Sequence, residues 1–238
     1  MNVYKTDKIE DLLKSNAYAG RGIIIGTSAD GKNAVTAYFI MGRSENSRNR
    51  VFVKENNDLR TEPFDASKVE DLSLIIYNAV RENGKTLVVT NGDQTDTIVE
   101  NMNKGMSFKD SLKCREFEPD APNLTPRISG ILNFADGFDY EMSILKSIDP
   151  EGSDCCRYTY FYPSKAGLGH FIHTYICDGN PLPTFCGEPE RIEIPNDIDG
   201  FADAIWTSLN ADNKISLYVR FTDIATGEYV DRLINKNN

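Results

Sequence analysis

Histidine and tryptophan are scarce in this chain of 238 residues, which has two histidines and one tryptophan. Its five cysteines are odd in number and irregularly spaced, which fits a reducing compartment better than a disulfide framework. No apolar run approaches the ~18 residues that span a membrane, and the N-terminal residues form no signal-peptide core. The sequence therefore predicts a cytoplasmic protein with no membrane partner.

Positive charge is also in deficit, because 26 Lys and Arg stand against 36 Asp and Glu. The resulting formal charge of −10 disfavours a nucleic-acid partner, since binding to nucleic acid depends on clustered Lys and Arg. A local basic pocket for one small phosphorylated molecule is still compatible with that total charge.

Several common active-site motifs are missing as well. The chain has no Gly-x-x-x-x-Gly-Lys-Ser/Thr loop, no Gly-x-Gly-x-x-Gly after a strand and no Gly-x-Ser-x-Gly elbow. His170, His173 and Cys177 fall in one expected strand, where the two histidines point to opposite faces. This spacing argues against a metal site.

Periodicity along the chain mixes helical and strand patterns. It predicts a helix over residues 7–15, a hairpin of strands 21–27 and 34–41, and mainly strands beyond residue 128. A late helix over 201–209 and a strand over 214–222 complete this pattern. No linker, repeat or long charge block interrupts the chain, so we expect an α+β fold in a single domain over residues 1–238.

Asn83-Gly84 separates two apolar runs and predicts a hairpin with a two-residue loop. In that register, Tyr77 faces Thr90. A helix that begins at Ser67 and ends near Arg81 is the alternative interpretation of the first run.

A polar turn follows this hairpin and leads into a helix that stops at Gly105, with Thr97 or Asp96 as its N-cap. A helix N-terminus presents free N–H groups to an anion. The predicted register brings Tyr77, Asn78 and Asn91 close to that terminus. A packed Tyr-Asn pair beside a simple turn explains the same residues without any ligand.

Positive charge is concentrated between Gly20 and Arg50, where five cations stand against two acids and give a net charge of +3. The cations are Arg21, Lys32, Arg43, Arg48 and Arg50. Because hydroxyls and amides are interleaved with arginines there, the segment suits an anion site, although a solvated loop has the same composition.

A Pro-rich segment from Phe117 to Arg127 is expected to be an irregular loop. The acidic residues that lead into it, including Glu118, are of a type usually solvated in loops. A carboxylate is nevertheless a common general acid or base where histidines are scarce.

Five segments, in the same order and at similar spacing, resemble the archaeal-type IMP cyclohydrolase family. They cover about residues 18 to 135, and the resemblance fades towards the C-terminus. The segments are Tyr18-Ala19-Gly20-Arg21, Gly42-Arg43-Ser44 with Asn49-Arg50, Tyr77-Asn78-Ala79-Val80-Arg81, Thr90-Asn91-Gly92-Asp93-Gln94-Thr95-Asp96-Thr97-Ile98 and Leu124-Thr125-Pro126-Arg127-Ile128.

This resemblance implies an enzyme that closes 5-formamidoimidazole-4-carboxamide ribonucleotide (FAICAR) to inosine 5′-monophosphate (IMP) with loss of water, in purine biosynthesis. It also implies a four-layered αββα sandwich resembling the N-terminal nucleophile hydrolase fold. The chain begins Met1-Asn2, so we expect it to lack the N-terminal nucleophile of those hydrolases. Ring closure within one molecule needs positioning and proton transfer, with no metal and no cofactor.

Matched residue by residue, the resemblance implies catalytic roles for Arg48, Tyr77 and Glu118. Glu118 and Tyr77 would transfer protons, and Arg48 would polarise the formyl oxygen or hold the substrate. Arg50 is an alternative to Arg48, because Arg-Asn-Arg permits a shift of two residues. The expected substrate contacts are Arg21, Arg50, Asn78, Asn91, Asp96, Thr97 and Arg127.

Two other functions stay open at the level of sequence. An amidohydrolase of the same fold would cleave amides and ignore FAICAR, and a noncatalytic nucleotide-binding protein would leave every substrate unchanged. The expected partner is a purine nucleotide, and the residues leave open whether the chain forms a homo-oligomer.

Overall fold

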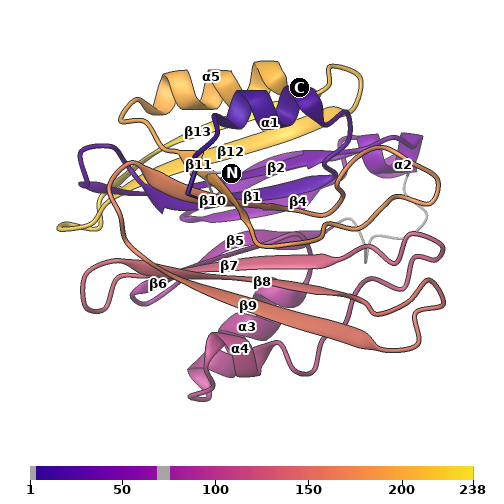
Figure 1. The fold of residues 1–238 in the computed structure, drawn as a ribbon, viewed down its shortest axis with the longest axis horizontal. Helices are drawn as coiled ribbons and strands as arrows, with labels where there is room; N and C mark the ends of the chain where they lie inside the picture. The colour runs from indigo at the N-terminus through magenta and orange to yellow at the C-terminus, as the bar shows by residue number, and fades with distance from the viewer. Residues whose placement is uncertain (1–3, 69–75, 238) are drawn as a thin grey trace.

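The computed structural model describes residues 4–68 and 76–237, which form two antiparallel sheets stacked face to face (Figure 1). The first sheet has the strand order β11 (Glu190–Glu193), β10 (Leu168–His173), β1 (Arg21–Thr27), β2 (Asn33–Met41), β12 (Lys214–Asp223), β13 (Tyr229–Asn235). The second has the order β3 (Val51–Glu55), β4 (Asp58–Glu62), β5 (Tyr77–Asn83), β6 (Thr86–Thr90), β7 (Arg127–Asn133), β8 (Asp139–Ser147), β9 (Cys155–Pro163).

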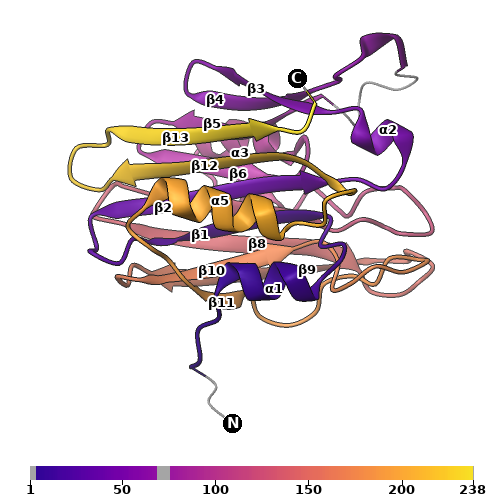
Figure 2. The same ribbon diagram turned by 90° about the horizontal axis from the view of Figure 1, so that it is seen from above.

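Helices cover the outer face of both sheets. α1 (Ile9–Ser15) and α5 (Ile198–Ser208) lie side by side over the first sheet (Figure 2), and α3 (Gln94–Asn103) and α4 (Phe108–Ser111) lie under the second. Two short elements, α2 (Glu45–Arg48) and a 3-10 turn at Ala66–Lys68, lie in connections. The predicted α+β class is confirmed and the layers form a sandwich, while the likeness to N-terminal nucleophile hydrolases stays a prediction.

The core lies between the two sheets and follows from the alternation of side chains along each strand. On β1, Ile23 and Ile25 point into the inter-sheet core, while Ile24 points to the helices on the outer face. Because both faces are covered, the strand is apolar throughout. Gly130 on β7 has no Cβ, and a Cβ there would lie 2.4 Å from Ile25 Cδ1, so this glycine leaves room for the Ile25 side chain between the sheets.

Most of the predicted elements are present. The first helix, the β1–β2 hairpin, the irregular loop after α4 and the late helix and strand all lie within a few residues of their expected positions. The N-cap of helix α4 is Ser107, whose side chain accepts a hydrogen bond from the Asp110 N–H.

The hairpin of β5 and β6 has a different register from the predicted one. Its loop is Gly84-Lys85, so Asn83 pairs with Thr86 and Val80 with Val89. Gly84 has a positive φ of 61°, which a glycine adopts at low cost. A shift of two residues leaves every side chain on its predicted face, but Tyr77 now pairs with Thr61 on β4 rather than with Thr90.

The helix that ends before Gly105 is confirmed as α3, whereas its predicted N-cap and the alternative helix through residue 81 are wrong. The helix from Ser67 falls partly on residues 69–75, outside the described residues, and residues 77–81 are strand. Helix α3 begins at Gln94 with Asp93 at its N-cap, so Asp96 and Thr97 lie inside its first turn and do not cap it. Local capping signals at Thr97 were outweighed by the earlier turn at Gly92-Asp93.

Ile25 is fully buried between the sheets, so removing part of its side chain should leave a cavity and lower the stability considerably. We expect Ile25→Ala to lower the free energy of unfolding by roughly 2–5 kcal/mol, measured by urea denaturation. Val230→Ala on β13, where the side chain is 54% exposed, is the control and should change it by less than about 0.5 kcal/mol. Equal effects of the two substitutions would contradict this account of the core.

Candidate functional site

A polar cavity of about 400 Å³ lies where β1 and β3 begin and where the loop from α4 to β7 crosses them. Three arginines and two carboxylates reach it from separate parts of the chain. Its lining includes Tyr18, Arg21, Arg43, Ser44, Asn46, Ser47, Arg50, Glu118, Asp120, Asn123, Thr125, Tyr175 and Leu182. The positive segment and the acidic loop of the sequence therefore meet in one place.

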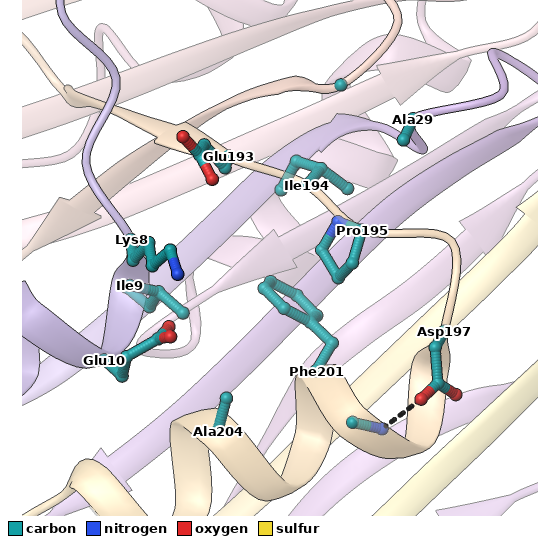
Figure 3. A pocket seen from close by; sticks show the side chains of 12 residues that line it. Lys8, Ile9, Glu10, Ala29, Glu193, Ile194, Pro195, Asp197, Phe201 and Ala204 are labelled. Atoms are coloured by element: carbon teal, nitrogen blue, oxygen red, sulfur yellow. Dashed lines mark hydrogen bonds between the residues drawn. The ribbon is translucent and has the colours of Figure 1, made fainter.

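A second cavity, of about 500 Å³, lies between α1, α5 and the end of β11 (Figure 3). Its walls are apolar side chains such as Ile194, Pro195 and Phe201. Lys8 is the one cation among its lining residues, which also include three carboxylates. This balance of charge does not suit a phosphorylated ligand, so the polar cavity is the better candidate.

Arg21 and Arg50 form the positive wall of the polar cavity. The side chain of Arg50 is almost completely buried, and the Nε atoms of both arginines have no hydrogen-bond partner within the described part of the chain. Burial and the charge of Arg21 lower the pKa of Arg50. Burial acts on Arg21 too, but the Glu118 carboxylate and the nearby phenols outweigh it and raise the pKa of Arg21. Buried donors without partners are costly, so this wall is suited to a polar or anionic ligand.

Glu118 faces these arginines from the loop after α4. Its N–H donates to the Thr125 carbonyl over 2.8 Å, which fixes the backbone from which the carboxylate projects. A Cβ added at Gly92 would lie 3.6 Å from Glu118 Oε1 and 2.7 Å from Arg127 Nη1, so a glycine is needed there. Burial outweighs the attraction of Arg21, Arg127 and Arg50, and it raises the pKa of Glu118. A carboxyl group in this environment is suited to proton transfer.

The loop that carries Glu118 is braced by polar contacts. The Asp120 carboxylate accepts hydrogen bonds from the N–H of Thr125, over 2.6 Å, and from its hydroxyl. The same hydroxyl lies 2.6 Å from the Tyr175 hydroxyl, and Asn123 Oδ1 accepts from the Leu182 N–H over 3.1 Å. The C-terminal half of the chain therefore helps to form the cavity.

Tyr77 and Asn78, which are adjacent on β5, point to opposite sides of the sheet. The Tyr77 hydroxyl points between the sheets, 2.8 Å from that of Tyr38, and it interacts electrostatically with Arg21 and Arg50. Asn78 instead donates to Asp96 on α3 over 3.0 Å, and Arg81 donates to the same carboxylate. Tyr77 thus interacts with the arginines of the cavity without being among the residues that line it, and Asn78 and Asp96 form a separate polar group beneath α3.

Asn91 and Arg127 hold the turn before α3 in place. Asn91 donates to the Pro126 carbonyl over 2.9 Å, and its Oδ1 accepts from the Ile128 N–H and from Gln94. Arg127 donates to Asp93 over 2.7 Å and to Gln94 over 2.8 Å. The amide of Asn91 makes three hydrogen bonds inside the protein, which suits a supporting position better than a substrate contact.

Arg48 and Thr97 are not among the residues that line the polar cavity. The exposed Arg48 donates from Nε to the Gly42 carbonyl and from Nη2 to Asn213, each over 3.1 Å. Arg50, two residues later, lines the cavity. The role predicted for Arg48 is still a prediction, but the geometry favours Arg50 for it.

Comparison with known proteins adds an independent observation. The model of the family described as "IMP cyclohydrolase-like protein" matches residues 18–228. The chain belongs to this family. The match extends well beyond residue 135, where the resemblance found in the sequence fades, and so it includes the segment that carries Tyr175.

Similar curated proteins from archaea are named IMP cyclohydrolase. One from Methanococcus aeolicus is 29% identical over 164 residues, which cover 67% of this chain and 75% of that protein. One from Methanopyrus kandleri is 32% identical over 66% of this chain and 75% of its own length. A relative from Haloquadratum walsbyi is 31% identical over 48% of this chain and 56% of its own length. These matches confirm the predicted family and support the enzyme class predicted with it.

Several residues that line the polar cavity of this chain were absent from the predicted site. Arg43 donates to Asp178 and to the Gly179 carbonyl, and its guanidinium lies 5.1 Å from the ring centroid of Tyr18. Ser44 and Ser47 lie beside it. The interleaved arginines and hydroxyls were a signal for these three residues. Tyr175 had no such signal, because only the fold brings it to the cavity, and only the fold brings Tyr38 to Tyr77.

Two observations concern metals and membranes. Within residues 4–68 and 76–237, no group of three or more His, Cys, Asp and Glu side chains is arranged to hold a metal ion. In the same ranges, no helix has the length and apolar character needed to cross a membrane.

The contacts of Asn91 predict that its main contribution is to stability. We expect Asn91→Ala to lower the free energy of unfolding by roughly 2–4 kcal/mol, because it leaves the buried Ile128 N–H and Pro126 carbonyl without partners. Chemical denaturation measures this, with Thr97→Ala on α3 as the control, where a change within about 0.5 kcal/mol is expected. A stable Asn91→Ala protein with impaired nucleotide binding would instead place Asn91 among the substrate contacts.

Proposed function

We propose that this chain closes FAICAR to IMP in the polar cavity. The observation that carries the proposal is the pair of the half-buried Arg21 and the buried Arg50, whose Nε atoms have no partner within the described residues, facing the Glu118 carboxyl whose pKa is raised. Membership of the family supports it. A purine nucleotide is the proposed substrate, and the cytoplasm is the proposed compartment.

Ring closure joins the carboxamide nitrogen of the substrate to its formyl carbon. Glu118 takes a proton from the attacking nitrogen, and Arg21 and Arg50 stabilise the negative charge that develops on the formyl oxygen. That oxygen receives one proton to become a hydroxyl and a second when it leaves as water. The formamido nitrogen loses its own proton as the new carbon–nitrogen double bond forms, so the atoms and charges balance. In this scheme Glu118 returns its proton to the oxygen in the first of these steps, and Tyr77 supplies the second proton and regains one from the formamido nitrogen.

The rest of the cavity suits the other end of the nucleotide. Arg43 is partly exposed, held by Asp178 and Tyr18, and flanked by the hydroxyls of Ser44 and Ser47. Guanidinium and hydroxyl groups are good donors to phosphate. We therefore assign the 5′-phosphate to this end, with the reacting groups at the buried end near Arg21 and Glu118.

The direct test is to incubate the purified protein with FAICAR and to follow IMP by absorbance. We expect conversion well above the uncatalysed rate, and Glu118→Gln should reduce kcat by about 100- to 10,000-fold because the proton acceptor is lost. Glu116→Gln is the matched control, since Glu116 is an exposed carboxylate two residues away, and it should retain activity. Binding of IMP without any conversion would favour the noncatalytic alternative, and cleavage of amides without conversion would favour the amidohydrolase.

The raised pKa of Glu118 predicts the acid side of the pH profile. A base must be deprotonated, so kcat/KM should fall as the pH drops through a pKa above the usual 4.5 of a glutamate. Arg127→Gln removes a charge that favours the carboxylate, and it should move this acid limb to higher pH. An acid limb that does not respond to Arg127→Gln would assign the titration to another group.

The two neighbouring arginines can be separated by substitution. We expect Arg50→Gln to lower kcat/KM by roughly 100-fold or more, because a donor to the developing oxyanion is lost. Arg48→Gln removes an equal charge outside the cavity and should change kcat/KM by less than about threefold at constant ionic strength. Thermal melts of both variants verify folding. The reverse pattern would return the catalytic role to Arg48.

A further inference from the structure

The hydroxyls of Tyr38 and Tyr77 join the two sheets beside the proposed site. Tyr38 lies on β2 of the first sheet and Tyr77 on β5 of the second, and their oxygens are 2.8 Å apart. The side chain of Tyr38 is fully buried, and its ring stacks on Phe52 with centroids 5.4 Å apart. Both phenols interact with the charges of Arg21 and Arg50.

Either hydroxyl can be the donor at this distance, and the proposed role of Tyr77 decides between them. Each phenol has one hydrogen, and Tyr77 is the one partner recorded for the Tyr38 hydroxyl in the described part of the chain. If Tyr77 donated to Tyr38, the hydrogen of Tyr77 would not be available to the substrate, so the proposed role of Tyr77 requires Tyr38 as the donor. The favoured arrangement has Tyr38 donating to Tyr77. Burial also raises the pKa of Tyr38 well above its usual value, so Tyr38 keeps its hydrogen at any working pH.

We propose that Tyr38 is a positioning residue that donates a hydrogen bond to Tyr77 and thereby leaves the hydrogen of Tyr77 free for the departing oxygen of the substrate. The inference rests on the proposed function. When Tyr77 gives up its proton, the bond from Tyr38 becomes a charge-assisted bond to a phenolate, which is shorter and stronger than a bond between neutral hydroxyls. Tyr38 therefore stabilises the transition state more than the bound substrate.

The test compares Tyr38→Phe with Tyr218→Phe. Tyr218 lies on β12, directly opposite Tyr38 of β2, and points into the same core. Its hydroxyl donates to Asp231 rather than to a residue of the proposed site, so it is a matched control. We expect Tyr38→Phe to lower kcat by roughly tenfold or more, with little change in KM. The alkaline limb of the kcat profile should move to higher pH, because a phenol without this donor ionises less readily. Tyr218→Phe should change neither kcat nor the limb.

A double-mutant cycle separates positioning from general packing. If Tyr38 acts through Tyr77, Tyr38→Phe should have almost no further effect on kcat in a Tyr77→Phe background. Additive losses, or equal losses in Tyr38→Phe and Tyr218→Phe, would overturn the inference. So would a folded Tyr38→Phe protein with the kcat and alkaline limb of the wild type.

Failure of this inference is distinct from failure of the proposed function. The wild type decides the function by converting FAICAR or not, whereas Tyr38 is judged by the difference between variants. If Tyr38→Phe does not fold, 3-fluorotyrosine at position 38 keeps the ring and strengthens the donor. The alkaline limb should then move to lower pH, and an unmoved limb would overturn the inference.

Discussion

The packing of the two sheets against each other is the constraint on which the site depends. Ile23 and Ile25 of the first sheet pack against the second, and Gly130 allows their close approach. Because Arg21 and Tyr38 come from the first sheet and Tyr77 from the second, the distance between the sheets sets the distance between these groups. The polar cluster lies at one end of the apolar interface, where it gains a rigid frame and a low dielectric.

The loop between α4 and β7 is the third component of the cavity, and polar contacts rather than apolar burial hold it. Asp120 binds the backbone and hydroxyl of Thr125, and Thr125 meets Tyr175 from the distant β10–β11 connection. Asn91 ties the end of the same loop to the turn before α3. The position of Glu118 therefore depends on three segments that are far apart in the chain.

The charge distribution also depends on the fold. The chain carries a net charge of −10, yet the polar cavity gathers Arg21, Arg43 and Arg50 against Glu118 and Asp120. Burial of these groups changes their behaviour, since it raises the pKa of Glu118 and lowers that of Arg50. A small phosphorylated substrate is compatible with this arrangement.

Local patterns in the sequence were sufficient to predict the class of the fold, most strands and the position of the irregular loop. They also located the concentration of arginines. These features depend on residue periodicity, turn chemistry and composition, which act over a few positions. The resemblance to a family supplied Tyr77 and Glu118 as candidates, both of which the fold brings to the arginine pair.

Tertiary structure alone decided the remaining features. It separated Arg50 from Arg48, turned Asn78 and Asp96 away from the cavity, and committed Asn91 to internal hydrogen bonds. It shifted the β5–β6 register by two residues and brought Tyr38 to Tyr77. The physical reason is that these outcomes depend on which face of a strand is buried and on contacts between segments that are distant in sequence. No local propensity encodes such contacts.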